Sequence, residues 1–333
     1  MPSAPRRIAR RVESWFRENR RALPWREAYN PYHVWLSEVM LQQTRMEVVL
    51  GYYSRFLNRF PTVRDLAAAS EHDVLAAWSG LGYYRRARML RDGAIAVVER
   101  FGGEVPESVE ELLTIPGIGR YTAGAIASIA HQRKAPIVDG NVARILARVF
   151  LIREPPLAAA WRHAEELVAA CTDPRELNQG LMELGALVCK PTNPRCDVCP
   201  LQKDCVAFAA NAVDEVPVRE AKKKTRALRI PLYLIRDAKG RILMRRESGK
   251  LMNAMFHLPH GNSELLETPP LEADTRQLLG TFRHTVTTRR IEFSLYDAVI
   301  ARVPRDYTWI DPASMHDVPH PSYVRKALKL AAR

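Results

Sequence analysis

The chain contains Leu112-Leu113-Thr114-Ile115-Pro116-Gly117-Ile118-Gly119-Arg120-Tyr121-Thr122-Ala123, and this stretch decides its fold. An amphipathic helix ends within it, a Pro-Gly-x-Gly turn follows, and a second helix begins. Glycine lets the backbone approach a phosphate closely, and the second helix offers unpaired N–H groups and the positive end of its dipole. We therefore expect Gly117, Gly119 and Arg120 to contact a nucleic-acid backbone. An ordinary corner between two helices is the alternative.

A second glycine-rich turn supports this expectation. It reads Trp78-Ser79-Gly80-Leu81-Gly82-Tyr83-Tyr84-Arg85-Arg86. A leucine and two tyrosines alternate here with arginines, which is typical of a loop that wedges between bases while the arginines hold the strand. We expect Leu81 to be exposed and to contact DNA together with Gly82 and Tyr83.

Helical periodicity dominates from about residue 6 to residue 210, interrupted by short turns rich in Gly and Pro. This pattern predicts an all-α architecture with tight connections. Helices are expected at residues 37–49, 74–78, 86–101, 121–130 and 142–150.

The pattern changes in the last third of the chain. A polar stretch at 213–227 contains Lys222-Lys223-Lys224 and has the composition of a linker. Beyond it, apolar runs at 230–235 and 242–244 flank Asp237-Ala238-Lys239-Gly240, a hairpin signature, and residues 291–296 alternate as a strand does. The prediction is a mostly α domain over residues 1–212, a linker over 213–227, and an α+β domain over 228–333.

The charge balance indicates the class of partner. The 333 residues include 50 Lys and Arg against 37 Asp and Glu, a net charge of +13. Such a surplus favours a polyanion, nucleic acid before membrane, although a basic solvated surface is the alternative. No apolar run approaches the roughly 20 residues that span a bilayer, and the arginine-rich start lacks the apolar core of a secretory signal. We expect no membrane contact and a cytoplasmic, nucleoid-associated location.

Four of the five cysteines crowd into one segment, as Cys189, Cys196, Cys199 and Cys205. Disulfides are improbable in a cytosolic chain of this size, so the cluster indicates a metal site. Four thiolates suit either tetrahedral zinc or an iron–sulfur cluster. Zinc usually takes two close pairs, whereas here one pair has a single cysteine on each side, so the spacing favours iron–sulfur. The separate Cys171 is expected to be a small buried hydrophobe.

Two carboxylates have the surroundings of catalytic groups. On a helix, Glu38 shares an apolar face with Val34 and Leu41. Desolvation raises the pKa of such a carboxyl, and at a pKa of about 6 roughly one in ten is protonated at pH 7, as a general acid requires. A buried ion-paired glutamate is the alternative. Asp139 precedes a helix and is expected to cap it, a role compatible with stabilising an oxocarbenium ion.

Seven blocks together resemble the helix–hairpin–helix DNA glycosylases and, within them, the MutY-type adenine DNA glycosylases. They cover about residues 8–210 in the family's order, and the last third also resembles the family's C-terminal domain, as at 253–259. The resemblance implies a repair enzyme that flips adenine out of the duplex into a pocket and carries a 4Fe-4S cluster on its four cysteines. The blocks are 23–26, 37–44, 78–88, 115–122, 138–142, 179–185 and the cysteine loop 189–205.

The resemblance also implies roles by position. Glu38 would protonate the imidazole ring of the adenine and Asp139 would stabilise the positive sugar, which agrees with the two-carboxylate logic of glycoside cleavage. Tyr121 and Asn141 would line the same site. The residues that would enclose the base are Trp25, Arg26, Leu41 and Glu183, and those that would fill or probe the gap in the helix are Gln43, Thr44, Leu81 and Tyr83.

Tyr121 separates two branches of these glycosylases. In the endonuclease III relatives, the position after Gly-x-Gly-Arg is a lysine that forms a Schiff base with the sugar and cuts the strand. A phenol cannot form an imine. We therefore expect a monofunctional enzyme that hydrolyses the glycosidic bond.

The C-terminal region resembles a Nudix fold but lacks the Arg-Glu-x-x-Glu-Glu cluster that holds magnesium, so nucleotide hydrolysis is not expected of it. The resemblance implies that this region reads an 8-oxoguanine opposite the adenine through a Phe-Ser-His hairpin. This chain departs there, with Phe282-Arg283-His284-Thr285 followed by Val286-Thr287-Thr288. We expect His284 and Thr287 to contact DNA, with a weaker preference for 8-oxoguanine over guanine.

The expected partner is double-stranded DNA with an adenine mispair, bound by a monomer. The nearest alternatives are glycosylases for an oxidised pyrimidine or for a mismatched thymine, and Tyr121 and the block around Glu38 argue against the first. A non-catalytic iron–sulfur regulator that binds DNA explains the charge, the hairpins and the thiols. It does not explain an acid in an apolar stripe.

Overall fold

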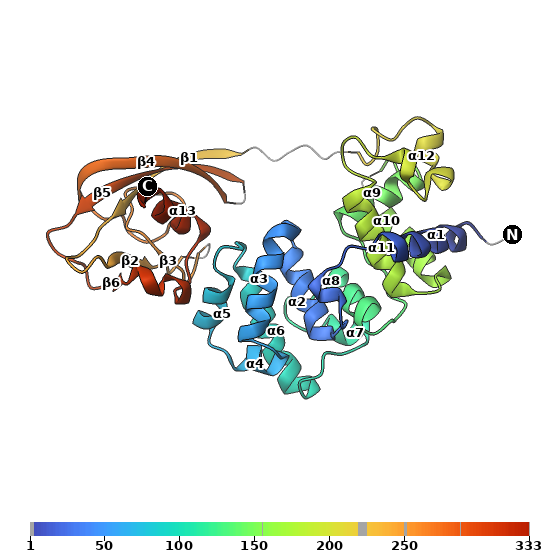
Figure 1. Cartoon of the computed structure of the whole chain (residues 1–333), viewed down its shortest axis with the longest axis horizontal. Helices are drawn as coiled ribbons and strands as arrows, with labels where there is room; N and C mark the ends of the chain where they lie inside the picture. Colours follow the sequence, from blue (N-terminus) through green and yellow to red (C-terminus); the bar gives the residue numbers. More distant parts are fainter. Residues whose placement is uncertain (1–2, 155, 219–224, 250–251, 287, 333) are drawn as a thin grey trace. The chain divides into compact units, whose positions relative to one another are not determined.

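The computed structural model describes residues 3–154, 156–218, 225–249, 252–286 and 288–332. Contacts group the chain into two compact units, whose elements are labelled in Figure 1. The first comprises Met1–Met46, Thr62–Arg64 and Asp92–Ala221, and the second comprises Glu47–Pro61, Asp65–Arg91 and Lys222–Arg333. This grouping differs from the predicted boundaries, because residues 47–61 and 65–91 join the C-terminal region. The three lysines of the predicted linker lie outside the described residues.

The first unit is helical. Its packing centres on α1 and α11, which lie against each other, while α9 and α10 complete the core. Ile8 and Val12 of α1 and Leu177, Leu181 and Leu184 of α11 recur at helical spacing and are buried in one cluster. The helices of this unit are α1 (Ala4–Asn19), α2 (Pro31–Leu41), α7 (Val109–Leu112), α8 (Arg120–Ala125), α9 (Gly140–Val149), α10 (Pro156–Ala170), α11 (Pro174–Leu187) and α12 (Val206–Ala209).

Side-chain caps fix where several of these helices begin. The Asn30 side chain accepts hydrogen bonds from backbone N–H groups of the first turn of α2, and Asp139 and Asp173 do the same for α9 and α11. Each such cap stabilises its helix by about 1 kcal/mol. The predicted single helix at 37–49 is wrong, because α2 ends at Leu41 and the chain turns at Gln43, whose φ is 56°.

The helix–turn–helix predicted around residue 117 is present. Gly117 adopts a φ of 81°, a conformation that side chains rarely take, and this lets the chain reverse between α7 and α8. Gly119 is the N-cap of α8, which runs directly into a π-helical turn, Ile126–Ala130. Because α8 begins at Arg120, directly after the turn between α7 and α8, Tyr121 lies in the first helical turn of α8.

The part of the second unit that precedes residue 92 is helical. Its described helices are α3 (Met46–Arg59), α4 (Val63–Ala68), α5 (Glu71–Trp78) and α6 (Arg85–Phe101), of which α6 continues into the first unit. The Phe56 ring of α3 packs edge-on against Trp78 of α5, with 5.7 Å between ring centroids. Trp78 and Phe56 are almost completely buried. The link between α5 and α6 is the second glycine-rich turn.

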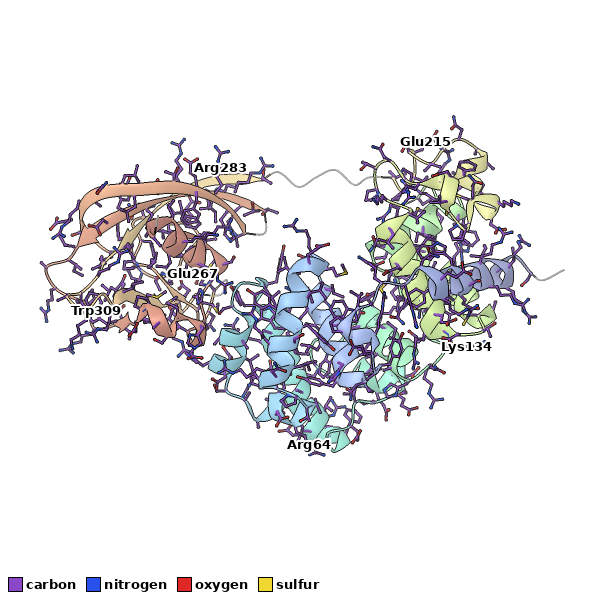
Figure 2. The ribbon with its side chains drawn as sticks, viewed as in Figure 1. Arg64, Lys134, Glu215, Glu267, Arg283 and Trp309 are labelled. Carbon is purple, nitrogen blue, oxygen red and sulfur yellow. The ribbon has the colours of Figure 1, made fainter. Side chains whose placement is uncertain are left out.

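Two three-stranded sheets follow. One has the order β1-β5-β4, with β1 (Arg226–Leu234) parallel and β4 (Asp274–Val286) antiparallel to β5 (Arg289–Val299). The other has the order β3-β2-β6, formed by β3 (Phe256–His257), β2 (Ile242–Arg246) and β6 (Tyr307–Ile310). Phe293 stacks on Tyr323 of α13 (Ser322–Ala331), 4.7 Å between centroids. Arg283, on the other face of β4, points away from α13 (Figure 2).

The predicted hairpin of residues 230–235 and 242–244 is only partly right. Its turn exists, because Asp237 accepts backbone hydrogen bonds from Lys239 and Arg241 and Gly240 has a φ of 76°. The two strands nevertheless belong to different sheets, since β1 pairs with β5. That pairing is non-local, and local alternation does not encode it. The strand predicted at 291–296 lies within β5 and is confirmed.

The predicted fold class, a mostly helical region followed by a region with sheets, is confirmed. The Nudix-like identity of the C-terminal region stays a prediction. Within the described part of the chain, no helix is both long enough and apolar enough to cross a membrane.

Candidate active site

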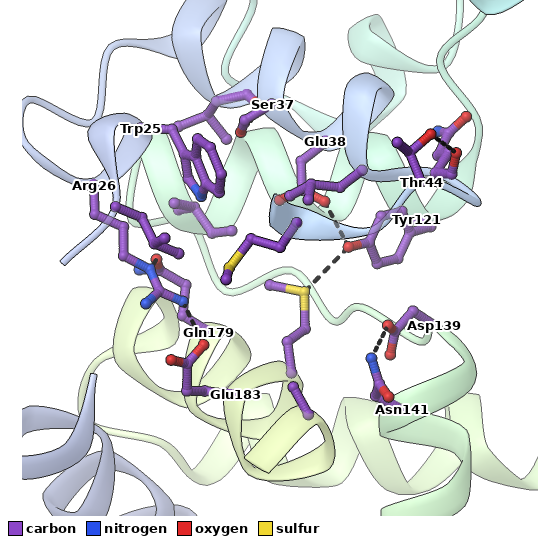
Figure 3. A pocket seen from close by; sticks show the side chains of 18 of the residues that line it. Trp25, Arg26, Ser37, Glu38, Thr44, Tyr121, Asp139, Asn141, Gln179 and Glu183 are labelled. Carbon is purple, nitrogen blue, oxygen red and sulfur yellow. Dashed lines mark hydrogen bonds and ion pairs between the residues drawn. The ribbon is translucent and has the colours of Figure 1, made fainter. Parts of the chain in front are cut away.

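One cavity of about 560 Å³ opens in the first unit, between the segment at residues 21–26, α2, α8, α9 and α11 (Figure 3). All eight residues predicted to be catalytic or to enclose the base line this cavity. The most distant two, Trp25 and Glu183, are 158 residues apart in the chain, so it is the fold that brings them together. The eight are Trp25, Arg26, Glu38, Leu41, Tyr121, Asp139, Asn141 and Glu183.

Glu38 is the buried acid of the cavity, with 6% of its surface exposed. Burial raises its pKa from 4.5 to about 7; the hydrogen bond from Tyr121 and the charge of Arg26 lower it, and the charge of Asp139 raises it. The desolvation predicted from its apolar stripe is therefore present. At pH 7 the carboxyl is poised between its two forms, as a general acid requires.

Tyr121 fixes the orientation of this carboxyl. Its hydroxyl donates to Glu38 Oε2 over 2.5 Å and lies 3.1 Å from the sulfur of Met182 (Figure 3). Burial and the charge of Glu38 raise the pKa of Tyr121 well above its ordinary value. The phenol therefore stays protonated and acts as a donor to the carboxyl.

Asp139 faces the same cavity from the start of α9. One of its oxygens accepts from the Val142 N–H over 2.7 Å, which is the predicted cap, and the other accepts from Asn141 Nδ2 over 3.0 Å. The Asn141 side chain in turn accepts from Arg144 over 2.8 Å. Arg144 also donates to the backbone carbonyl of Gly185, over 2.8 Å. This chain of bonds orients the carboxylate; the sequence interpretation missed Arg144.

Glu183 forms the opposite wall and behaves unlike Glu38. Arg21 and Arg26 donate to its two oxygens over 2.6 and 3.0 Å. Burial alone would raise its pKa, but the hydrogen bonds from the two arginines hold the pKa of Glu183 at about 2. Arg26 also donates to Gln179 over 3.0 Å. Arg21 was missed in the sequence because it is one of seven arginines near the start of the chain.

The remaining residues of the first unit that were predicted to contact DNA lie at the mouth of this cavity or in and next to the turn between α7 and α8. Gln43 and Thr44 line the cavity mouth. Gly117 and Gly119 shape the α7–α8 turn. Arg120 is paired with Glu165 over 2.6 Å and lies over the ring of Trp161. Its expected phosphate contact therefore requires this exposed ion pair to open.

In the second unit, the expectation that Leu81 is exposed is wrong. Leu81 is buried, with 7% of its surface exposed, whereas the neighbouring Tyr83 is 47% exposed. Gly82 and Tyr83 both have positive φ values, 75° and 51°. The turn therefore presents Tyr83 to solvent and turns Leu81 inward.

The residues predicted to read the opposite base are only partly described. His284 faces α13, where its Nε2 lies 3.4 Å from the Ser322 hydroxyl. Burial and the charge of Lys326 lower its pKa to about 4, so it is neutral at pH 7. Thr287 lies outside the described residues.

The four clustered thiols line a second cavity, bounded on one side by Ile145 and Val149 of α9. Burial, reinforced by the neighbouring thiols, raises the pKa of Cys199 to about 12. Thiolates in such a place need a cationic group to stabilise them, so the donor set suits an iron–sulfur cluster. Among the described residues, no three His, Cys, Asp or Glu side chains are placed to hold a single metal ion. The cluster stays a prediction.

Two arginines of α1 hold the cysteine loop. Asp204, next to Cys205, has a side chain only 6% exposed and pairs with Arg7 over 2.8 Å and with Arg11 over 2.6 Å. Arg148 of α9 donates to the Lys190 carbonyl over 2.7 Å. The loop is thus fastened to two helices of the first unit.

Comparison with known proteins shows which proteins this chain resembles. Residues 36–170 match the model of the HhH-GPD superfamily base excision DNA repair proteins. The chain is 47% identical over 212 residues to the adenine DNA glycosylase of Rattus norvegicus, a match that covers 60% of this chain and 41% of the rat protein. It is 37% identical over 217 residues to the adenine DNA glycosylase of Buchnera aphidicola from Schizaphis graminum, covering 64% and 62%. The matches thus span about two fifths to three fifths of these relatives.

Solved structures of DNA glycosylases have a similar fold. A thermostable thymine-DNA glycosylase superposes with a TM-score of 0.57 at 28% identity, covering 62% of this chain and 97% of that protein. Endonuclease III in a non-covalent DNA complex superposes with a TM-score of 0.53 at 22% identity, covering 63% of this chain and 99% of that one, which shows the fold alone. The resemblance found in the motifs is confirmed.

Proposed function

We propose that this chain, with its match to the HhH-GPD superfamily, is a monofunctional adenine DNA glycosylase. It would hydrolyse the N-glycosidic bond of adenine mispaired with 8-oxoguanine or guanine in duplex DNA, after flipping the base into the cavity. One observation carries the proposal: a buried carboxyl, Glu38, has a pKa of about 7 on the wall of a base-sized cavity that a second carboxylate, Asp139, also faces. The names of the similar proteins support adenine as the base.

In the proposed reaction, Glu38 protonates the imidazole ring of the adenine and so makes it a better leaving group. Tyr121 donates to Oε2, so we assign Oε1 to the base. At a pKa of about 7, close to half of the Glu38 carboxyls carry a proton at pH 7. Trp25, Leu41 and the ion-paired Glu183 enclose the purine on the other sides.

Asp139 balances the positive charge that develops on the sugar as the bond breaks. Asn141 and the helix N-terminus hold both of its oxygens by hydrogen bonds, so the carboxylate is already oriented before the substrate arrives. Water then attacks the sugar. The phenol of Tyr121 cannot form an imine, so the abasic strand stays intact.

The four cysteines Cys189, Cys196, Cys199 and Cys205 are proposed to hold a 4Fe-4S cluster, which when bound cross-links the loop through iron–thiolate bonds. The C-terminal region is proposed to be Nudix-like and to contact the opposite base, with a weaker preference for 8-oxoguanine because no imidazole follows Val286. We further propose a monomer that works on the nucleoid in the cytoplasm.

Adenine release from a duplex under single-turnover conditions tests the proposal. We expect release from duplexes with adenine opposite 8-oxoguanine or guanine, and a loss on the order of 10²–10⁴ in rate for Glu38→Gln. Glu110→Gln, at an exposed position, is the matched control. Release of thymine but not adenine would support a thymine glycosylase instead. Tight binding of duplex with no base release would support a non-catalytic regulator.

A further inference from the structure

The loop of residues 79–84, here called the probe loop, joins α5 to α6 and carries Tyr83. Tyr83 is 47% exposed, while Leu81 and Tyr84 on either side are 7% and 8% exposed. The loop thus buries two of its large side chains and offers the third to a partner. Its conformation decides where the Tyr83 ring lies.

The helices that flank the probe loop hold one side of it. Trp78 Nε1 and an Arg86 guanidinium nitrogen both donate to the Gly82 carbonyl, each over 3.2 Å. The Arg86 guanidinium also lies 5.4 Å from the centre of the Tyr83 ring. These contacts are local in sequence and fix the second half of the loop.

Residues more than 230 positions further along the chain hold the other side. The His320 N–H donates to the Ser79 hydroxyl over 3.0 Å, and the His320 carbonyl accepts from the Tyr84 hydroxyl over 3.0 Å. Both backbone groups of His320 are therefore satisfied by side chains of the probe loop. Ser79 and His320 are each 4% exposed, so water does not replace these bonds easily.

Arg325 of α13 completes the contact. It donates to the Ser79 carbonyl over 2.8 Å and to the Tyr52 hydroxyl over 3.0 Å. Tyr52 itself donates to the same carbonyl over 2.9 Å. Gly80 has a φ of 105°, and a Cβ there would lie 2.1 Å from the Tyr52 oxygen and 2.9 Å from Arg325. Glycine is therefore required at position 80 for its conformation and for this close approach.

We infer that Arg325 and the backbone of His320 are positioning groups for the probe loop, through which the C-terminal region sets how Tyr83 is presented to DNA. The probe loop and the C-terminal region belong to one compact unit, so these contacts lie within it. The inference rests on the proposed function only in taking DNA as the partner of Tyr83. It makes Arg325 a determinant of recognition without direct contact to a base.

Hydrogen exchange measured by mass spectrometry on the full chain without DNA is the first test. Arg325→Ala should speed exchange of the amides at 79–84 by about tenfold or more, because the loop opens locally, and leave the amides of α9 unchanged. Lys326→Ala is the matched control, since the next side chain of α13 donates to the Arg283 carbonyl over 3.1 Å instead. Tyr84→Phe should reproduce the effect of Arg325→Ala. Unchanged exchange in the loop of both variants would overturn the inference.

Binding to a duplex that contains a non-hydrolysable fluorinated deoxyadenosine opposite guanine is the second test. Arg325→Ala should weaken binding about threefold to tenfold, and should add nothing in a Tyr83→Ala background, because residues that act through one group are not additive. Equal weakening in both backgrounds would overturn the inference, since Arg325 would then act independently of Tyr83. Wild-type protein that binds this duplex but releases no adenine from the natural one would refute the proposed function alone. If the wild-type protein binds no duplex, the hydrogen-exchange experiment alone tests whether Arg325 holds the probe loop.

Discussion

Replacing Glu38 by Gln should stabilise the protein at neutral and higher pH while slowing adenine release by a factor on the order of 10²–10⁴. Burial raises the pKa of Glu38 from 4.5 to about 7. Below about pH 4.5 the carboxyl is neutral both folded and unfolded, so it costs nothing. Between about pH 4.5 and 7 the carboxyl ionises in the unfolded chain but keeps its proton in the folded one, so about 3 kcal/mol of stability is lost across this interval and no more above it. Glutamine never ionises and its carbonyl still accepts from Tyr121.

Urea unfolding of wild type and Glu38→Gln at several pH values measures this effect. The stability advantage of the variant should grow by about 2–3 kcal/mol between about pH 5 and about pH 8.5. Glu110→Gln, at an exposed position, should show no such trend. An advantage that is the same at every pH would refute the reasoning, because it would mean that Glu38 does not titrate in this range. Single-turnover adenine release by the wild type should change little below pH 7 and fall about tenfold per pH unit above it.

Three further predictions follow from contacts in the first unit. Borohydride should trap little covalent complex between the wild type and DNA, because Tyr121 cannot form an imine, whereas efficient trapping at the active site would contradict a monofunctional enzyme. Arg144→Lys should slow single-turnover adenine release about tenfold while duplex affinity is kept, since one ammonium nitrogen cannot reach the acceptors on Asn141, Gly185 and Cys189 that different nitrogens of the guanidinium serve; an unchanged rate would show that Asn141 needs no such support. Asp204→Asn breaks two ion pairs to α1 and should speed iron loss to a chelator, measured by absorbance, relative to Asp197→Asn at an exposed site of the same loop; equal rates of loss would contradict it.

The cavity's carboxylates were predictable because their signals are local. The position of Glu38 in an apolar helical stripe follows from the spacing of its neighbours, and the capping role of Asp139 follows from the extended residues before it and the helix after it. The structure adds that Tyr121 and Asn141 orient these two groups. Their catalytic roles stay predictions.

Features that depend on distant parts of the chain were not predictable in this way. Leu81 was expected to be exposed because a leucine and two tyrosines that alternate with arginines are typical of a loop that wedges between bases, yet this turn packs in a unit that includes residues 222–333. The pairing of β1 with β5 is likewise non-local. The arginines that matter most, Arg21 and Arg144, look like any others in a chain rich in arginine. Only the acceptors that they reach distinguish them.

The two glutamates of the cavity make its two walls electrostatically different. Two guanidinium groups keep Glu183 ionised at any physiological pH, whereas Glu38 exchanges a proton near neutrality. A planar heterocycle that binds between them would meet the exchangeable proton of Glu38 at one edge. At its other edge it would meet the ion pairs of Glu183 with Arg21 and Arg26. In the proposed reaction, the ring nitrogen that accepts the proton must lie at the edge that faces Glu38. An analogue with carbon in place of that ring nitrogen would therefore occupy the cavity as a competitive ligand and survive intact.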